Sequence, residues 1–534
     1  MPTLDWIGKK AVLKHHRQVP YRLLQCDASL SAGDPDAGNL LVQGDNLEAL
    51  KALLPYYAGK VKCIYIDPPY NTGNEQWVYN DAVNSSEIRA WLGKAVGREM
   101  EDLSRHDKWL CMMYPRLSLL REFLSEDGLI FVSVDENEYR HLAVLMDEVF
   151  GEINRLETLV WKKSYGGGQK SKHVVNLHEY IEVFARGIDR IGELELPPDE
   201  KVLRYYKYRD AKFEVRGPYR LQPLATNSMD ERPNLRYAIP FEGEHIWPEK
   251  QWQWEKSRAL LALKSDELVI RKTRGKFTVS YKQYLRDASG EERTRKPYSI
   301  VEGVYTQQGT NELKAIFGDG KVFTFPKPRS LIQHLLQFAT ATDSIVLDSF
   351  AGSGTTGHAL LALNKADGGQ RRFVLVEMDE NIGANVAAKR LRAAVEGKGD
   401  AVPALGGGFR YCKLGEPLFD EGGNIRESVR FPELAAHVFF TETGAPIPKR
   451  ATGKTPLLGV HNGKAVYLLF NGVMGDKRPV GGNVLTHDVA HELPAHPAGH
   501  ASRVVYGEAC RLGPKSLAHY GITFRQIPFE LRVD

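Results

Sequence analysis

Short apolar runs alternate with longer segments in which apolar positions recur every three or four residues. The runs predict strands at Val61–Ile66, Leu129–Val134, Thr158–Lys163, Tyr180–Ala185, Ser344–Ser349 and Arg372–Val376. The longer segments predict helices at Asp107–Leu124, Asp135–Phe150 and His358–Asn364. Apolar strands that alternate with helices are typical of a mostly parallel sheet covered by helices on both faces. The pattern therefore predicts an α/β fold.

The alternation stops between Gly187 and Ser299, where aromatic and basic residues replace the regular pattern. It resumes near Ser344 and loosens again near Gly406. We therefore expect one domain in two halves, with an insertion between them and an accessory domain after them. The predicted divisions are a polar lead-in at 1–39, the first half at 40–186, the insertion at 187–310, the second half at 311–415 and the C-terminal domain at 416–534.

Asp67-Pro68-Pro69-Tyr70 follows the strand predicted at Val61–Ile66. Open α/β sheets hold their ligands at the carboxyl ends of their strands. Asp67 and the carbonyl of Pro68 can accept hydrogen bonds from an NH2 group, Pro69 fixes the turn, and the ring of Tyr70 can stack on a flat group. These residues suit a site that holds a base by its exocyclic amine, although a plain proline turn would show the same letters. The segment Asn71–Ser104 is expected to form a long loop of this site.

A glycine-rich turn, Phe350–Thr356 (FAGSGTT), joins a predicted strand to a predicted helix. Such a turn lets a cofactor approach bare backbone at the start of a helix. The turn has neither the third glycine of the dinucleotide fingerprint nor a P-loop lysine, which argues against NAD and ATP. Glu377 ends the next predicted strand, where an acid commonly binds the hydroxyl pair of a ribose.

Both motifs resemble those of DNA amino-methyltransferases that use S-adenosyl-L-methionine. The DPPY motif precedes the glycine motif by 350 − 67 = 283 residues, an order that marks the circularly permuted class called β. Longer stretches resemble the modification (Mod) subunits of type III restriction–modification systems, among them LVQGDN (Leu41–Asn46), YIDPPYNTG (Tyr65–Gly73), IFVSVDENE (Ile130–Glu138), PKPRSLI (Pro326–Ile332) and YLLFNGV (Tyr467–Val473). The resemblance spans nearly the whole chain and is weakest between Gly187 and Ser299.

The resemblance implies a Rossmann-like, circularly permuted methyltransferase fold with an inserted target-recognition domain. It also implies that the enzyme methylates the N6 amine of a flipped adenine in duplex DNA. Asp67, Pro68, Pro69 and Tyr70 would be catalytic, and Asp45 would bind the adenine end of the cofactor. The other implied cofactor-binding residues are Glu377, Lys327, Phe350, Ala351, Gly352, Gly354 and Thr355. The expected partners are a second copy of the chain, which the C-terminal domain would help to assemble, and a restriction subunit with helicase and nuclease activity.

The composition is that of an ordinary globular protein, with 534 residues of which 42% are apolar and 26% charged. No apolar run approaches the ~20 residues of a membrane span, and Asp5 and two lysines interrupt the N-terminus, which argues against a signal peptide. The five cysteines are scattered without a C-x-x-C pair. We therefore expect reduced thiols, a cytoplasmic location and no metal site. The cluster LTHDVAHELPAHPAGH also fails the H-E-x-x-H pattern of zinc enzymes.

The net charge of +4 is unevenly distributed. Residues 201–300 contain 22 Lys and Arg against 13 Asp and Glu, a local charge of +9, which leaves 4 − 9 = −5 for the remainder. A concentrated positive charge is typical of a segment that binds a polyanion, and a solvated basic face is the alternative. Candidate contacts to DNA are Arg204, Arg209, Arg271, Lys272 and Arg274. The Tyr and Trp residues of this segment are expected to form its small core.

Other functions also fit parts of the sequence. Cytosine carries an exocyclic amine as well, but enzymes that methylate its N4 usually have serine at the place of Asp67. A catalytically idle DNA-binding subunit would not need both motifs intact. A methyltransferase acting on RNA or protein would not account for the basic insertion or for the resemblance to type III Mod subunits.

Overall fold

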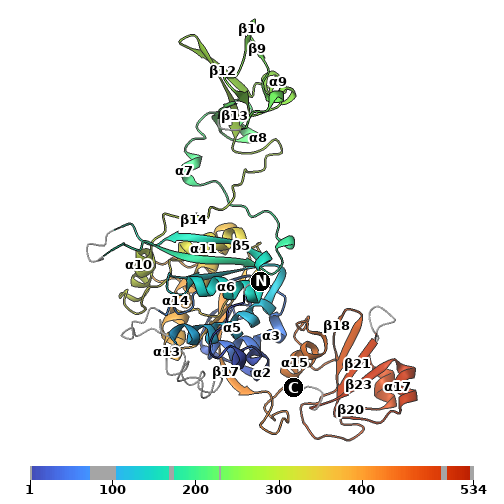
Figure 1. Ribbon diagram of the computed structural model, residues 1–534. Helices are drawn as coiled ribbons and strands as arrows, with labels where there is room; N and C mark the ends of the chain where they lie inside the picture. Colours follow the sequence, from blue (N-terminus) through green and yellow to red (C-terminus); the bar gives the residue numbers. More distant parts are fainter. Residues whose placement is uncertain (1–2, 72–103, 167–172, 228–229, 495–501, 529–534) are drawn as a thin grey trace. The chain divides into compact units, whose positions relative to one another are not determined.

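The computed structural model describes residues 3–71, 104–166, 173–227, 230–494 and 502–528 (Figure 1). It divides the chain into two compact units, Leu194–Pro297 and the remainder, Met1–Glu193 with Tyr298–Asp534. The smaller unit lies within the predicted insertion. The assignment of functional domains to the five predicted ranges stays a prediction. Among the described residues, no helix is both long and apolar enough to cross a membrane.

A ten-stranded mixed sheet forms the centre of the larger unit, in the order β1-β17-β2-β16-β15-β3-β4-β6-β5-β14. In this order the strands are β1 (Arg22–Gly33), β17 (Gly408–Pro417), β2 (Leu40–Gln43), β16 (Arg372–Glu377), β15 (Ile345–Asp348), β3 (Val61–Ile66), β4 (Leu124–Val134), β6 (His178–Ala185), β5 (Arg155–Lys162) and β14 (Ile300–Val301). The six strands from β17 to β4 are parallel to one another. β1 runs antiparallel to β17, and β6 runs antiparallel to both of its neighbours. The mostly parallel α/β sheet predicted from the sequence is therefore confirmed.

The strands that carry the two sequence motifs lie side by side at the centre of this sheet. Leu347 of β15 is in register with Ile64 of β3, and on its other side β15 pairs with β16, which ends in Glu377. Because all three strands are parallel, their carboxyl ends meet at one edge of the sheet. Asp67, the glycine turn and Glu377 therefore start from the same edge, although they are far apart in the sequence.

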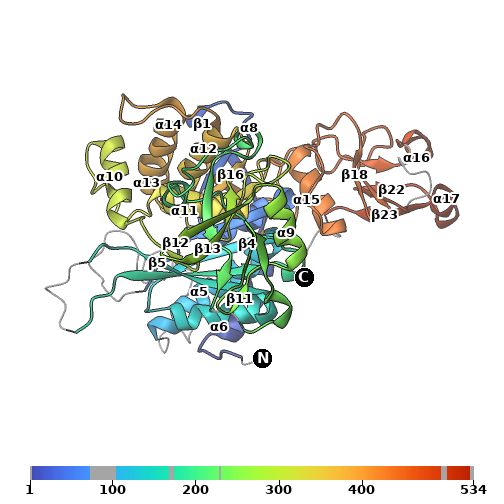
Figure 2. The ribbon, with the colours of Figure 1, turned by 90° about the horizontal axis from the view of Figure 1, so that it is seen from above.

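Helices cover both faces of the sheet (Figure 2). On one face, α3 (Asn46–Tyr57) packs on α5 (Arg105–Phe123), which packs on α6 (Tyr139–Phe150). On the other face, α11 (Arg329–Ala339) packs on α12 (Thr355–Asp367), which packs on α14 (Ala388–Glu396), and α10 (Thr306–Phe317) also contacts α14. The apolar side chains of α5, such as Trp109 and Leu120, are buried in the core of the larger unit. They are therefore not available for a dimer interface.

The N-terminal residues differ from the expected polar lead-in. They form two short helices, α1 (Lys9–Val12) and α2 (His15–Gln18), and then the edge strand β1, which pairs antiparallel with β17. Cys26 and Cys412 face each other in this pair and are joined by a disulfide, with 3.8 Å between their Cα atoms. The expectation that all five thiols are reduced is therefore wrong for this pair. No local pattern could indicate it, because the two cysteines are 386 residues apart.

The C-terminal residues form a four-stranded sheet in the order β18-β19-β21-β23, together with the helix α15. These elements are α15 (Phe431–Thr443), β18 (Leu457–His461), β19 (Lys464–Leu468), β21 (Ser502–Gly507) and β23 (Ile522–Gln526). Tyr21, Leu23 and Tyr56 pack against the core of this part, and the amide of Ile447 donates to the carbonyl of Pro55 at 3.0 Å. This part therefore shares its core with the N-terminal residues, and the compact units do not separate it from the rest.

The smaller unit, Leu194–Pro297, has a three-stranded antiparallel sheet in the order β12-β13-β7. Its strands are β12 (Leu268–Thr273), β13 (Lys276–Tyr284) and β7 (Tyr219–Pro223), and its longest helix is α9 (Lys256–Lys264). Trp252 is in its core and Trp254 packs against that core, as expected. Tyr205 and Trp247 are instead exposed. The expected aromatic core is thus made by only part of the Tyr and Trp cluster.

Candidate active site

One cavity of about 770 Å³ in the larger unit is lined by both sequence motifs. Its lining includes the predicted catalytic residues Asp67, Pro68, Pro69 and Tyr70. It also includes the predicted cofactor-binding residues Phe350, Ala351, Gly352, Thr355, Glu377 and Lys327. The tertiary structure therefore brings the two distant segments together at the carboxyl edge of the sheet. Their roles in binding and catalysis stay predictions.

Asp67 lies directly after β3 and forms an ion pair with Lys327, whose Nζ is 2.9 Å from Oδ1. The side chain of Asp67 is 25% exposed, and the side chain of Lys327 is 9% exposed. Burial raises the pKa of Asp67, and the positive charge of Lys327 counteracts part of that rise. Lys327 was predicted on the cofactor side. Its backbone carbonyl does accept from the hydroxyl of Thr355 at 3.3 Å, but its ammonium lies on the Asp67 side.

Tyr70 is held in place by its hydroxyl and by its ring. The hydroxyl donates to Oε2 of Glu179 at 2.9 Å, and the ammonium of Lys327 lies 4.7 Å from the centroid of the ring. The indole of Trp109 donates to the carbonyl of Pro69 at 2.7 Å, which anchors the DPPY turn to α5. Glu179 was not predicted as a site residue. The signal for it is an acidic residue directly before the apolar run that predicts the strand Tyr180–Ala185.

The glycine turn has the backbone geometry that its sequence predicts. Gly352 and Gly354 have φ angles of 52° and 77°, values that residues other than glycine rarely adopt. Gly354 is the residue before α12, and it does not line the cavity itself. The amide of Gly352 donates to Oε2 of Glu377 at 2.7 Å. The acid at the end of β16 therefore also stabilises the glycine turn.

A buried arginine that was not predicted from the sequence supports this turn from behind. Arg390 of α14 is fully buried, and its guanidinium donates to the hydroxyls of Ser353 at 2.9 Å and Thr355 at 2.8 Å. It also forms an ion pair with Glu312 at 2.7 Å. A single arginine on an apolar helix face is the sequence signal that points to such a residue.

Asp348 adds a buried carboxyl to the floor of the cavity. It accepts hydrogen bonds from the amide of Phe350 at 3.0 Å and from the hydroxyl of Thr356 at 2.6 Å. Burial raises its pKa to about 7. The hydroxyl of the adjacent Ser349, which also lines the cavity, has no hydrogen-bond partner among the described residues. The hydroxyl of Ser349 can therefore form a hydrogen bond with a ligand in the cavity.

Asp45 does not line the cavity, although the next residue, Asn46, does. The carboxylate of Asp45 caps α3 by accepting from the amides of Leu47 and Glu48, and it forms an ion pair with the buried Arg116 at 3.3 Å. Arg116 also donates to the side chain of Asn46. Contact between Asp45 and a cofactor stays a prediction, and the observed partners of Asp45 are structural.

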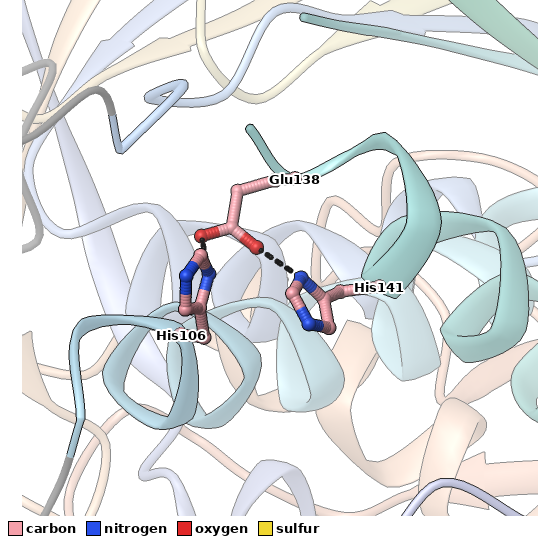
Figure 3. A group of neighbouring side chains, drawn as sticks. All are labelled: His106, Glu138 and His141. Carbon is pink, nitrogen blue, oxygen red and sulfur yellow. Dashed lines mark hydrogen bonds and ion pairs between the residues drawn. The ribbon is translucent and has the colours of Figure 1, made fainter. Parts of the chain in front are cut away.

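A cluster of His106, Glu138 and His141 lies beside the DPPY segment (Figure 3). Nδ1 of each histidine faces one oxygen of the Glu138 carboxylate, at 2.8 Å and 2.9 Å. Glu138 is fully buried and also accepts from the side chain of Asn71, which follows Tyr70. The spacing of these groups could hold a metal ion, but the hydrogen bonds account for the arrangement. Glu138 is the residue before α6, and its i,i+3 spacing from His141 in the first turn of that helix is the sequence signal for this pair.

The five candidate DNA contacts all lie in the smaller unit, and all are exposed. Arg271 and Lys272 are on β12, and Arg274 is in the turn between β12 and β13. Lys272 is paired with Glu244 at 2.8 Å, and Arg209 lies over the ring of Phe213. Their exposure is compatible with binding phosphate groups, and contact with DNA stays a prediction.

The cavity fits the cofactor that the sequence resemblance implies. Carboxylates at Asp67, Asp348 and Glu377 would attract a positively charged sulfonium group, and Glu377 ends a strand where ribose hydroxyls are commonly bound. Phe350 offers an apolar surface, and the glycine turn exposes backbone at the start of α12. The donor set therefore suits S-adenosyl-L-methionine.

Comparisons with known proteins agree with this geometry. The profile of a DNA methylase family, N6_N4_Mtase, matches residues 61–389. The type III restriction–modification enzyme StyLTI Mod subunit of Salmonella typhimurium is 33% identical over 400 residues, which cover 72% of this chain and 60% of the relative. The type II methyltransferase M.KpnI of Klebsiella pneumoniae is 31% identical over 380 residues, which cover 66% of this chain and 84% of the relative.

Among solved structures, the M1.HpyAVI–SAM complex covers 66% of this chain and 100% of its own, with 13% identity and a TM-score of 0.32. That likeness is too distant to add to the assignment. The chain spans about three fifths of the length of the Salmonella relative. The family profile covers more than half of the chain and includes both motif strands with the cavity between them. The chain therefore belongs to the DNA methylase family.

Proposed function

We propose that this protein is a site-specific DNA methyltransferase that uses S-adenosyl-L-methionine to methylate the N6 amine of an adenine flipped out of duplex DNA. The observation that carries the proposal is the shared cavity, in which an aspartate suited to an amine lies near a glycine turn suited to the cofactor. Membership of the DNA methylase family and the identity with M.KpnI support it.

The residues of the chain mainly position the amine and polarise it. The lone pair of an adenine amine is delocalised into the ring, so the amine is a poor nucleophile. Asp67 and the carbonyl of Pro68 would accept hydrogen bonds from its two N–H groups and so return electron density to nitrogen, while Tyr70 would stack on the base. The cofactor, held by Glu377 and the glycine turn, supplies a methyl group on a positively charged sulfur. Asp67 then accepts the proton that the methylated amine loses.

Positioning is an adequate source of catalysis for this reaction. Flipping the base out of the duplex costs a few kcal/mol, and orientation of two reactants can contribute roughly 7–11 kcal/mol. The basic smaller unit supplies the sequence-independent attraction to phosphate groups that such flipping requires. No covalent intermediate with the enzyme is needed.

The experiment that tests the proposal is transfer of a labelled methyl group from S-adenosyl-L-methionine to duplex DNA, followed by mass spectrometry of the released nucleosides. N6-methyladenine is the expected product. N4-methylcytosine as the product would instead show that the enzyme methylates cytosine, whose N4 amine the family name also includes. Absence of transfer to DNA, with transfer to RNA or with none at all, would refute the proposal.

The resemblance to Mod subunits further suggests that the protein is the modification subunit of a type III restriction–modification system, working on DNA in the cytoplasm. The StyLTI relative is such a subunit by name. Co-purification of a restriction subunit encoded beside the gene would support this assignment. A homodimer is part of the same proposal, and light scattering of the purified chain would test it.

A further inference from the structure

The ammonium of Lys327 has a defined acceptor for each of its three hydrogens. Its Nζ lies 2.9 Å from Oδ1 of Asp67, 2.6 Å from the hydroxyl of Tyr70 and 3.3 Å from Oε2 of Glu179. A lysine ammonium can donate three hydrogen bonds and accept none. Lys327 is therefore paired with two carboxylates and one hydroxyl in a buried site.

This ammonium donates to the carboxylate that the proposed mechanism gives to the amine of the base. It also donates to the hydroxyl of Tyr70 at 2.6 Å, at the edge of the ring on which the base would stack. An amine and an ammonium would compete for the same carboxylate oxygen. The base can engage Asp67 fully only if Lys327 gives up part of that contact.

Glu179 offers the ammonium a second carboxylate close by. It lies on β6, 3.3 Å from the Lys327 ammonium, and it also accepts from Tyr70 at 2.9 Å. Lys163 is 3.2 Å from its other oxygen. A small shift of Lys327 towards Glu179 would break the ion pair with Asp67. The ammonium would stay paired with the carboxylate of Glu179.

We propose that Lys327 and Glu179 are positioning residues for the methyl transfer. Lys327 orients the Asp67 carboxylate by its ion pair, and it shifts towards Glu179 when the amine of the base binds to Asp67. The inference rests on the proposed function and deepens it.

The ionisation of Asp67 depends on the same groups. Burial raises its pKa, Lys327 lowers it and Glu179 raises it. The other titratable groups that face it are Tyr70, Tyr65 at the end of β3 and Asp348 at the end of β15. Removal of Lys327 leaves Glu179 paired with Lys163 but takes from Asp67 the positive charge that lowers its pKa, so Asp67 should hold its proton to higher pH.

The test compares Lys327→Met, Glu179→Gln and the double variant for methyl transfer to duplex DNA across pH. In K327M, kcat at pH 7 should fall about tenfold or more. The pH at which kcat rises should also increase by about one unit. In E179Q, Lys327 has only Asp67 as a carboxylate partner, so KM for DNA should rise more than kcat falls. The double variant should lose less kcat than the product of the single losses, because Asp67 is then free of a neighbouring carboxylate.

Two further variants separate positioning from a merely structural role. Lys327→Arg keeps the charge, so its pH profile should stay near that of the wild type. Lys51→Met removes another buried ammonium, one that donates to the carbonyls of His16 and Arg17, and it should leave the pH profile of kcat unchanged. An unshifted pH profile in K327M, or strictly multiplicative losses in the double variant, would overturn the inference.

A measurement without DNA keeps this test distinct from that of the proposed function. The free energies of unfolding of D67N, K327M and their double variant should show a favourable coupling between Asp67 and Lys327 at pH 7. An absent coupling would overturn the inference even in an active enzyme. A wild-type chain that transfers no methyl group to DNA would instead reject the proposed function, whatever the coupling.

Discussion

In the proposed mechanism, Asp67 accepts a hydrogen bond from the amine that is methylated. Asp67→Ala should lower methyl transfer to duplex DNA by roughly a hundredfold or more, a loss typical of a preorganised group that acts on the reacting atoms. Binding of S-adenosyl-L-methionine, measured by calorimetry, should stay within a few-fold of the wild type, because the glycine turn and Glu377 are untouched. Transfer at a near wild-type rate would contradict the proposed mechanism.

A substitution at Gly354 would test the importance of the glycine turn. Its φ of 77° strains any other residue, and an added Cβ would meet the backbone of Ala387 at 3.4 Å. Gly354→Ala should cost roughly 1 kcal/mol or more of stability and should also weaken cofactor binding, because the turn precedes α12. Gly444→Ala is the matched control. Gly444 has a φ of 67° with open space around it, and it ends α15 outside the cavity, so that variant should lose stability alone.

At the scale of single elements, Asp348 at the end of β15 makes the stability of the folded state depend on pH. Asp348 has a pKa of about 7 against an ordinary value of 3.8. Below 3.8 both the folded and the unfolded state hold the proton. As pH rises from 3.8 towards 7, only the unfolded state releases it, so this group makes the folded state progressively less stable.

Asp348→Asn removes that titration. The difference in free energy of unfolding between the variant and the wild type should therefore shift in favour of the variant as pH rises from about 4 to about 7, and then level off. Urea unfolding at several pH values would measure it. Asp343→Asn, in the exposed turn before the same strand, controls for the loss of one negative charge. A difference that stayed constant over this pH range would contradict the assigned pKa.

Elements could be predicted well where their signal is local. β3 has the predicted bounds, Val61–Ile66, and α5 (Arg105–Phe123) differs from its prediction by two residues at its start and one at its end. β4 begins at Leu124 rather than at the predicted Leu129, because residues 125–128 are polar and do not extend the apolar run. The strand pairs irregularly with β3 over these residues. The orientation of β6 could not be predicted, because a strand shows no direction of pairing in its own residues.

At the scale of the whole molecule, the excess of positive charge in the smaller unit predicts how binding depends on salt. Neutralising Arg271, Lys272 and Arg274 together should weaken binding to duplex DNA and flatten the dependence of log K on log salt, by about 0.9 for each phosphate group that the protein no longer neutralises. Fluorescence anisotropy at several salt concentrations would measure it. Lys14→Ala, an exposed lysine of the larger unit, is the control. An unchanged slope in the triple variant would place the DNA-binding residues elsewhere.

The sequence by itself determined the α/β class and the two motif strands, and it predicted the roles of Asp67, Tyr70 and the glycine turn. Those features depend on residues that are near one another in the chain, so apolar periodicity and turn chemistry reveal them. Only the tertiary structure decided which charges meet in the cavity. Lys327 is 260 residues from Asp67, and Glu179 is 109 residues from Tyr70. The order of strands in the folded sheet brings such groups together, and no local pattern carries that order.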